Sequence, residues 1–286
     1  MPVRRTVLPL VTSLFAVAVV AVLSAQEPRL EVPPYNTMTD DQEIALGREA
    51  AAAIEAEQHL TFVEVPAVRT YVSSLVEQLA RASQRPRMPY SIKVVDTPDI
   101  NAFALPGGFL YVNRGLMEWA RNESELAAAL SHEISHVVGR HGANNISRML
   151  VADSLLFEAS RVLTGGETPA RLLKQLGGPV AFLAAMKFSR EDELQADVLA
   201  YYNVQRAGWS PDGMVELLHH LGERSNNVDA LLAFTSSHPV PADRELQIVN
   251  EMRNAPPRQD LVHDRPNFRS AQDFLKRLRR PQTKPQ

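Results

Sequence analysis

Hydrophobic residues recur at two different spacings along the chain, and the changes between them divide it into elements. Up to residue 82 they recur every three or four positions, as expected for α-helices that bury one face. This spacing predicts a helix that begins after Thr39, which can form a capping box with Gln42, and a second helix over Pro66–Ala82. Both helices would pack one apolar face against a core.

Residues 91–112 carry a strand pattern instead. Ser91–Val95 is predicted as one strand, and Ala102–Leu105 with Phe109–Val112 as a hairpin whose turn lies at residues 106–108. After the hairpin the helical spacing returns, and no internal repeat of about 30 to 45 residues is present. The pattern therefore predicts a predominantly helical α+β domain with a small antiparallel β-sheet.

The later helices include one with a clear start and one that is strongly apolar. Asn122 and Glu125 form a capping box ahead of an apolar stripe that runs to about Gly139. Pro179–Met186 is far too short to cross a bilayer, so we interpret it as a buried helix.

The first 25 residues are organised like a targeting segment. Arg4 and Arg5 precede an uncharged apolar run over Val7–Leu23, and small residues that permit cleavage follow. The run is slightly shorter than the ~20 residues that span a bilayer, so a cleaved signal peptide and an uncleaved N-terminal anchor both stay open. We expect residues 26–280 to form a single domain in an exported compartment such as the bacterial periplasm, with residues 281–286 as a disordered tail. Membrane contact is expected only through residues 7–23, if they stay attached.

Composition narrows the possible chemistry. The chain has 286 residues and a formal charge of −3, which argues against nucleic acid as a partner, since nucleic-acid binders usually carry a basic excess. It contains no cysteine, which excludes disulfides, thiolate metal ligands and a cysteine nucleophile. Any metal site must therefore consist of histidine and carboxylate side chains.

Residues 132–136, HEISH, place two of the eight histidines one helical turn apart. His132 and His136 then project from the same face of the capped helix and can bind one metal ion. Glu133 lies about 100° away around the helix axis, close enough to contact a water molecule beside that ion. The segment predicts the metal-binding helix of a metallopeptidase.

A catalytic zinc site commonly has three protein ligands and one open position. The metzincin pattern would place the third histidine where this chain has Gly142, and His141, one position early, is expected at the C-terminal end of the motif helix. A later helix over residues 187–202 offers carboxylates: Glu193 and Asp197 share one face, whereas Glu191 points about 200° away from Glu193. We therefore predict Glu193 as the third ligand and Asp197 as the acceptor of a hydrogen bond from a ligand histidine.

The segment HEISHVVGRHG, followed further along by SREDELQAD and SSHPVPADR, resembles the HtpX-like and CAAX-prenyl-protease-like gluzincin metallopeptidases. The resemblance extends over about residues 41–274, includes NAFALPGG at residues 101–108, and is greatest to the soluble exported branch. That branch includes periplasmic proteases of outer-membrane protein assembly and Oma-type mitochondrial proteases. The resemblance implies one Zn²⁺ per chain, which a His2Glu set with an open position also favours over manganese or iron.

The residues that the resemblance assigns agree with those chosen from spacing. It implies zinc ligands at His132, His136 and Glu193, a catalytic Glu133 and a supporting Asp197.

The resemblance also adds residues that spacing does not single out. His238, in SSHPVPADR, would act at the active site, where it would either stabilise the oxyanion or occupy the open metal position in a resting state. Arg190 and Arg244 would be structural ion-pair partners.

The implied reaction is hydrolysis of peptide bonds. Zinc lowers the pKa of its bound water to about 7, and Glu133 would accept the proton of that water as it attacks the peptide carbonyl. Asn101, Ala102, Phe103 and Ala104 would form an edge strand that an extended polypeptide can join. The sequence thus predicts a zinc-dependent endopeptidase of protein quality control, with unfolded or misassembled polypeptides as substrates.

Three other functions stay open. The chain can be a zincin-fold chaperone or assembly factor whose proteolysis is secondary or latched by His238, an amidase that acts on cell-wall peptides, or an inactive protein with a structural metal. Glu133→Gln separates the first from a peptidase, because holding of client proteins should survive the substitution while cleavage should not.

Overall fold

The structure is a computed structural model, and it describes residues 36, 38–152, 173–174, 176–223, 238 and 242–278 of the chain. The expected targeting segment at residues 1–25 and the expected tail at residues 281–286 lie outside the described residues. Within those described ranges, no helix is both long enough and apolar enough to cross a membrane.

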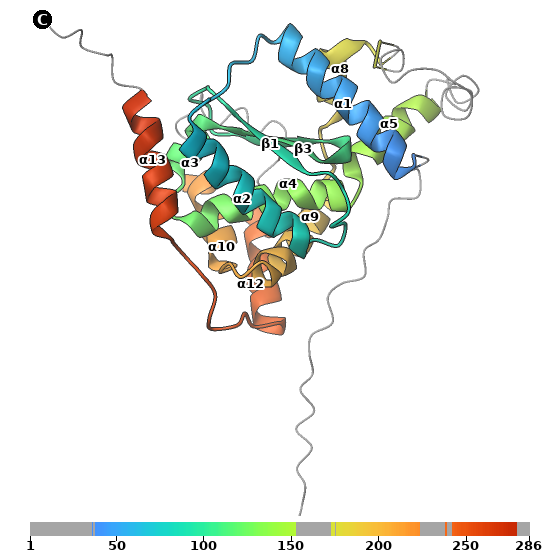
Figure 1. The fold of residues 1–286 in the computed structure, drawn as a ribbon. Coiled ribbons are helices and arrows are strands. Elements are labelled where there is room, and N and C mark those ends of the chain that lie inside the picture. Colours follow the sequence, from blue (N-terminus) through green and yellow to red (C-terminus); the bar gives the residue numbers. More distant parts are fainter. Residues whose placement is uncertain are drawn as a thin grey trace, which may run out of the picture.

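Helices make up most of the described fold, with three strands between the second and third of them (Figure 1). In chain order the elements are α1 (Asp40–Glu57), α2 (Pro66–Ala82), β1 (Ser91–Val95), β2 (Ala102–Leu105), the 3-10 turn η1 (Pro106–Gly108), β3 (Phe109–Asn113), α3 (Arg114–Trp119), α4 (Glu123–Val138), α5 (His141–Ala152), α8 (Gly178–Ala185), α9 (Arg190–Arg206), α10 (Asp212–Glu223), α12 (Ala242–Asn254) and α13 (Pro266–Leu278). The predicted α+β class with few strands is confirmed.

The sheet has the order β1-β3-β2 and is mixed. β2 and β3 form the predicted antiparallel hairpin, in which Phe103 faces Tyr111, but β1 pairs with β3 in parallel, so the prediction of a purely antiparallel sheet is wrong. β3 lies between β1 and β2; because the hairpin makes it antiparallel to β2, and β2 runs opposite to β1, β3 runs in the direction of β1. A strand pattern identifies a strand but not its neighbour, which is a matter of tertiary packing.

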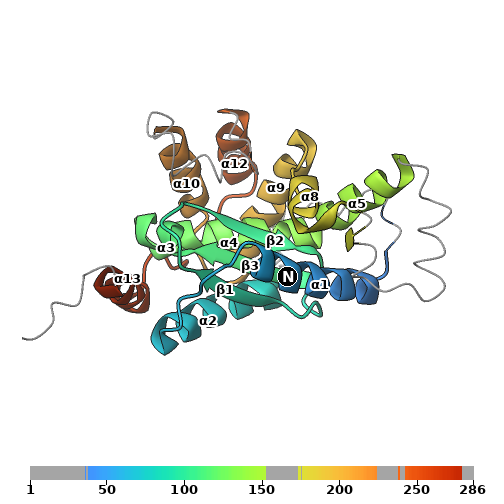
Figure 2. The ribbon, with the colours of Figure 1, turned by 90° about the horizontal axis from the view of Figure 1, so that it is seen from above.

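Helix α4 runs through the middle of the molecule. All of its 16 residues are buried, and it packs against α2, α9, α10 and strand β2. Figure 2 shows the sheet crossing over α4, with α2 on one side and α9, α10 and α12 on the other. Polar side chains on a helix enclosed in this way are costly to bury unless they find a partner.

Capping residues define where the important helices begin. Thr39 and Gln42 form the predicted capping box of α1, and Ser189 forms a capping box with Asp192 at the start of α9. At α4 the side chain of Asn122 accepts a hydrogen bond from the backbone N–H of residue 125 at 2.9 Å, as predicted. The Glu125 carboxylate accepts a hydrogen bond from the backbone N–H of residue 121, not from that of residue 122 as a capping box requires. The predicted return bond of this capping box is therefore wrong, because the chain enters the helix with the N–H of residue 121 facing the carboxylate.

Helix α4 ends before His141, which begins α5, so the expectation of His141 at the C-terminal end of the motif helix is wrong. Gly139 caps α4, and Arg140 then adopts a left-handed conformation with φ of 58°. The Arg140 guanidinium donates to Glu43 at 2.5 Å and to the backbone carbonyl of Met38. These contacts with α1 and with Met38, two residues ahead of it, hold the sharp turn and direct His141 back toward α4.

Candidate metal centre

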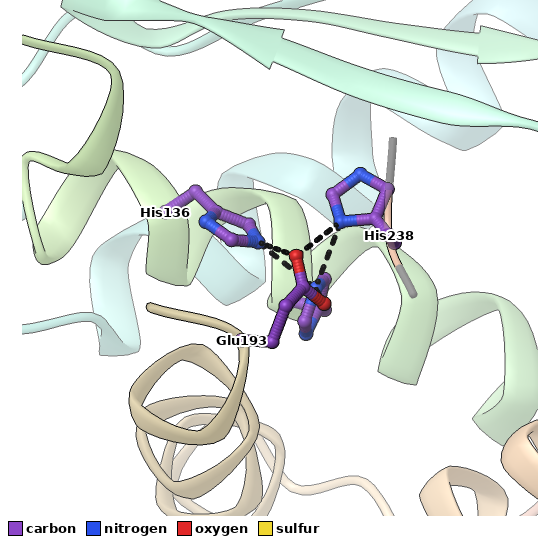
Figure 3. Close-up of side chains that lie close together, drawn as sticks. His136, Glu193 and His238 are labelled. Atoms are coloured by element: carbon purple, nitrogen blue, oxygen red, sulfur yellow. Dashed lines mark hydrogen bonds and ion pairs between the residues drawn. The ribbon is translucent and has the colours of Figure 1, made fainter. Parts of the chain in front are cut away.

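Three elements bring four side chains of metal-binding type together. His132 and His136 come from α4, Glu193 comes from the first turn of α9, and His238 precedes α12; each offers one ligand atom, and these atoms all lie within 4.8 Å of one another. All four side chains are buried. Figure 3 shows His136 and His238 on either side of the Glu193 carboxylate, each with a dashed line to the same oxygen, Oε1.

The spacing of the ligand atoms fits a small tetrahedral cation. His132 Nε2 lies 2.9 Å from His136 Nε2 and 3.3 Å from Glu193 Oε2, and His136 Nε2 lies 3.4 Å from Glu193 Oε1. Tetrahedral zinc with bonds of about 2.1 Å separates its ligand atoms by about 3.4 Å. The two imidazoles and one carboxylate are also the ligand set of many catalytic zinc sites, so the residues present fit zinc.

Glu133 has a buried carboxylate beside the site. The residue is 1% exposed, and neither of its oxygens has a hydrogen-bond partner among the described residues, although His238 Nε2 lies 3.3 Å from Oε1. Burial raises the pKa of Glu133 above its usual value, although His238 and His132 lower it in part. A carboxyl group with a raised pKa, beside a metal site, is suited to accept and return a proton near neutral pH.

Two charged residues support His132 and Glu193. Asp197 accepts a hydrogen bond from His132 Nδ1 at 2.9 Å, which leaves Nε2 facing the other ligands. Arg244 donates to both oxygens of Asp197, at 2.7 and 2.8 Å, and also lies 2.8 Å from Glu193 Oε2. Burial opposes the ionisation of Asp197, but Arg244 and His132 together lower its pKa below the usual value. One buried cation therefore holds two buried anions in place.

The site also favours positive charge on His132. Burial would lower its pKa, but Glu193 and Asp197 raise it to about 9. The same neighbours explain Glu193, whose ionisation burial opposes and whose pKa the three histidines around it nevertheless lower far below the usual range. A cation at this point, whether a proton or a metal ion, compensates the carboxylates, and a metal would displace the proton.

His136 has different support. Its Nδ1 lies 2.9 Å from Nδ1 of His141, which is 0% exposed. Phe188 stacks on the His136 ring with the ring centroids 3.7 Å apart and 17° between the planes. Burial lowers the pKa of both His136 and His141 below the usual value.

His238 lies on the remaining side of the cluster. Its Nδ1 is 2.9 Å from Glu193 Oε1 and 3.3 Å from His132 Nε2, and its Nε2 is 3.3 Å from Glu133 Oε1. The side chain is 1% exposed. It therefore contacts a predicted ligand and the predicted proton acceptor at once.

The structure brings together the candidate residues His132, Glu133, His136, Glu193, Asp197 and His238. Arg190 and Arg244, both expected to be ion-pair partners, differ: Arg190 pairs with Asp243 at the surface, whereas Arg244 lies within the site. Reasoning from sequence missed His141 and Phe188 as neighbours of His136. The signal available for His141 was its position directly after a Gly139-Arg140 turn.

The segment predicted to bind substrate lies next to the site. Ala102, Phe103 and Ala104 belong to β2, which is one of the two edge strands of the sheet and packs against α4, and Asn101 directly precedes it. The backbone N–H of Asn113 donates to the carbonyl of Asn101 at 2.9 Å. Because hydrogen-bonded pairs alternate along an antiparallel ladder, the backbone groups of residues 102 and 104 face away from β3, on the side of β2 where no described strand pairs. Both residues are nevertheless buried, at 0% and 6% exposure.

Comparison with known proteins gives one family and several relatives. The profile of peptidase family M48 matches residues 66–252. The beta-barrel assembly-enhancing protease of Yersinia pestis is 29% identical over 259 residues, which cover 88% of this chain and 51% of that protein. The mitochondrial metalloendopeptidase OMA1 of Schizosaccharomyces pombe is 28% identical over 174 residues, which cover 61% of this chain and 50% of that protein.

A shorter relative is the metalloprotease LoiP of Escherichia coli K12, 27% identical over 164 residues, which cover 57% of this chain and 63% of that protein. The chain spans about half the length of the first two relatives, with 51% and 50% of each covered.

Proposed function

The chain belongs to peptidase family M48, and on that premise we propose that it is a zinc-dependent endopeptidase that cleaves unfolded or misassembled proteins in an exported compartment. The observation that carries the proposal is the convergence of His132, His136 and Glu193 from two helices, with the buried carboxylate of Glu133 beside them. A structural metal site would need no such carboxylate, because its ligands leave no open position.

His132, His136 and Glu193 would hold one zinc ion. When bound, zinc supplies a Lewis acid that polarises the peptide carbonyl and makes water acidic enough to react at neutral pH. Asp197 keeps Nε2 of His132 directed at the site by holding Nδ1, and Arg244 keeps Glu193 and Asp197 in place. These residues fix the ligands before any substrate arrives.

Glu133 would carry a proton from the attacking water to the leaving amine. Its oxygens accept a proton from the attacking water and return it to the nitrogen of the leaving amine, so Glu133 acts first as general base and then as general acid. Burial raises the pKa of Glu133, which supports this role because a carboxyl group with a pKa closer to neutral can both accept and release a proton.

The position of His238 favours a second candidate function. A side chain that contacts both Glu193 and Glu133 stands where water and a peptide carbonyl have to enter. This arrangement supports a latched resting state, and with it a chaperone or assembly factor whose proteolysis is secondary. Once displaced by substrate, the same imidazole would be placed to donate to the oxyanion.

The proposed substrate class rests on β2 and on the relatives. The backbone groups of Ala102 and Ala104 face away from β3 and would pair with an extended chain once that chain displaces what now buries them. Only unfolded or loosely folded proteins provide such a chain. The Yersinia pestis relative is named for enhancing β-barrel assembly, which is consistent with substrates rich in unpaired strands. The signal-like pattern of residues 1–25 supports an exported location.

Cleavage of fluorescently labelled casein by the purified protein tests the proposal. The parent should contain one zinc per chain and cleave casein; Glu133→Gln should keep its zinc and lose about 10²–10⁴-fold in activity. Glu191→Gln, the same substitution at an exposed position of α9, is the matched control and should cleave like the parent. A parent that protects unfolded proteins from aggregation but cleaves nothing, with or without Glu133, would favour the holding function.

A further inference from the structure

We propose that His141 is a positioning residue for zinc binding: it accepts a hydrogen bond from His136 Nδ1 and so fixes the ring that presents Nε2 to the metal, while Gln195 fixes the tautomer of His141. The inference rests on the proposed function, in which His136 is a zinc ligand. It concerns a side chain that neither the motif spacing nor the ligand cluster includes.

The contacts form a chain that leads away from the site. Figure 3 shows one nitrogen of His136 directed at Glu193 and the other directed away from it. The second nitrogen, Nδ1, lies 2.9 Å from His141 Nδ1, and His141 Nε2 lies 2.7 Å from the side-chain oxygen of Gln195. Both histidines are buried, at 2% and 0% exposure, so water does not compete for these hydrogen bonds.

The position of each proton follows from these contacts. A metal bound through the lone pair of His136 Nε2 leaves the ring proton on Nδ1, which must then donate to His141 Nδ1. His141 can accept there only as the neutral tautomer with its proton on Nε2. That proton faces the Gln195 oxygen, an acceptor, so every nitrogen along the chain has a suitable partner.

The backbone around residue 140 places His141 for this role. The left-handed Arg140 reverses the chain, and the His141 ring then lies directly over Gly139. A Cβ atom on Gly139 would come within 2.4 Å of His141 Nε2 and 2.8 Å of Cε1. Since the ring is buried and hydrogen-bonded at both nitrogens, it cannot move aside without losing one of these bonds.

Charge explains why a histidine suits this position. Glu133, Glu193 and Asp197 already place three buried carboxylates around the site, with Arg244 beside two of them. A carboxylate in place of His141 would add a further buried anion at a large desolvation cost. A neutral imidazole orients His136 without that charge.

Two substitutions test the positioning role. His141→Phe keeps a ring but removes the acceptor, and Gly139→Ala keeps every polar group while displacing the ring; Gly139 has a φ of −71°, which alanine adopts freely. We expect each to weaken zinc binding about 10–100-fold, measured by competition with a chromophoric chelator. Gly222→Ala is the control, because a Cβ there meets no atom within 4 Å, and its zinc affinity should equal that of the parent.

A second measurement needs no variant. In the zinc-loaded parent with ¹⁵N-labelled histidine, NMR should find His141 protonated at Nε2 and bare at Nδ1, and His136 protonated at Nδ1. A proton on Nδ1 of His141 overturns the inference even if the variants fail to fold, and so does an unchanged zinc affinity in folded His141→Phe and Gly139→Ala. A parent that binds no zinc overturns the proposed function and this inference together, whereas a zinc-binding parent with equal variants overturns the inference alone.

Discussion

Replacing Arg244 with methionine should destabilise the metal-free protein severely. Arg244 is 1% exposed and contacts Asp197 at 2.7 and 2.8 Å and Glu193 at 2.8 Å, and both carboxylates are themselves 1% exposed. Methionine keeps a long side chain, so the main change is the loss of the cation between two buried anions. Removing one partner of a buried ion pair costs about 3–5 kcal/mol. The free energy of unfolding of a typical domain is about 5–15 kcal/mol, so this loss is a substantial share of the stability.

The matched control is Arg190→Met. Arg190 also pairs with a carboxylate, that of Asp243, but its side chain is 64% exposed. Water solvates both of these charges when the pair is broken, so the substitution should leave the free energy of unfolding close to that of the parent.

The assay is urea denaturation followed by circular dichroism, on parent and variants stripped of metal with a chelator. The Arg244→Met midpoint should fall clearly while the Arg190→Met midpoint stays. Adding zinc supplies another cation beside Glu193, so the deficit of Arg244→Met should become smaller. Equal midpoints for the two variants would refute the reasoning that burial makes the Arg244 contacts strong.

Three further predictions concern the metal and the substrate strand. Removing zinc with a chelator should lower the melting temperature of the parent, and restoring it should recover about 4 kcal/mol of stability at a free zinc concentration about 1,000 times the dissociation constant; an unchanged melting temperature would contradict metal binding to the folded state. His136→Ala and Glu193→Ala should each hold clearly less zinc than the parent by elemental analysis, and full zinc content in both would show the ligand assignment to be wrong. Ala104→Pro removes an N–H that faces away from β3 and should slow casein cleavage, while lowering the melting temperature less than Phe103→Pro, which also breaks the ladder to β3. Normal casein cleavage by Ala104→Pro would exclude strand addition.

The local spacing of hydrophobic residues was sufficient to predict where helices and strands lie and which helix faces are buried. The observed bounds of α2 and β1 are Pro66–Ala82 and Ser91–Val95, as predicted. A strand buries every second residue and a helix every third or fourth, so nearby positions in the sequence are enough to reveal each element. The same rule put His132 and His136 on one face of α4. In each of these cases the residues involved lie within one or two turns of each other, where the geometry of the backbone alone sets their direction.

Contacts between distant segments were decided only by the tertiary structure. β3 lies between β1 and β2 and so pairs in parallel with β1, and no alternation of residues encodes that order. Arg244 comes from α12 and joins two carboxylates of α9, and His141 turns back to His136 because Arg140 is held by α1. A sequence pattern specifies which face of an element is buried; which residue of a remote element meets that face depends on how the whole core packs.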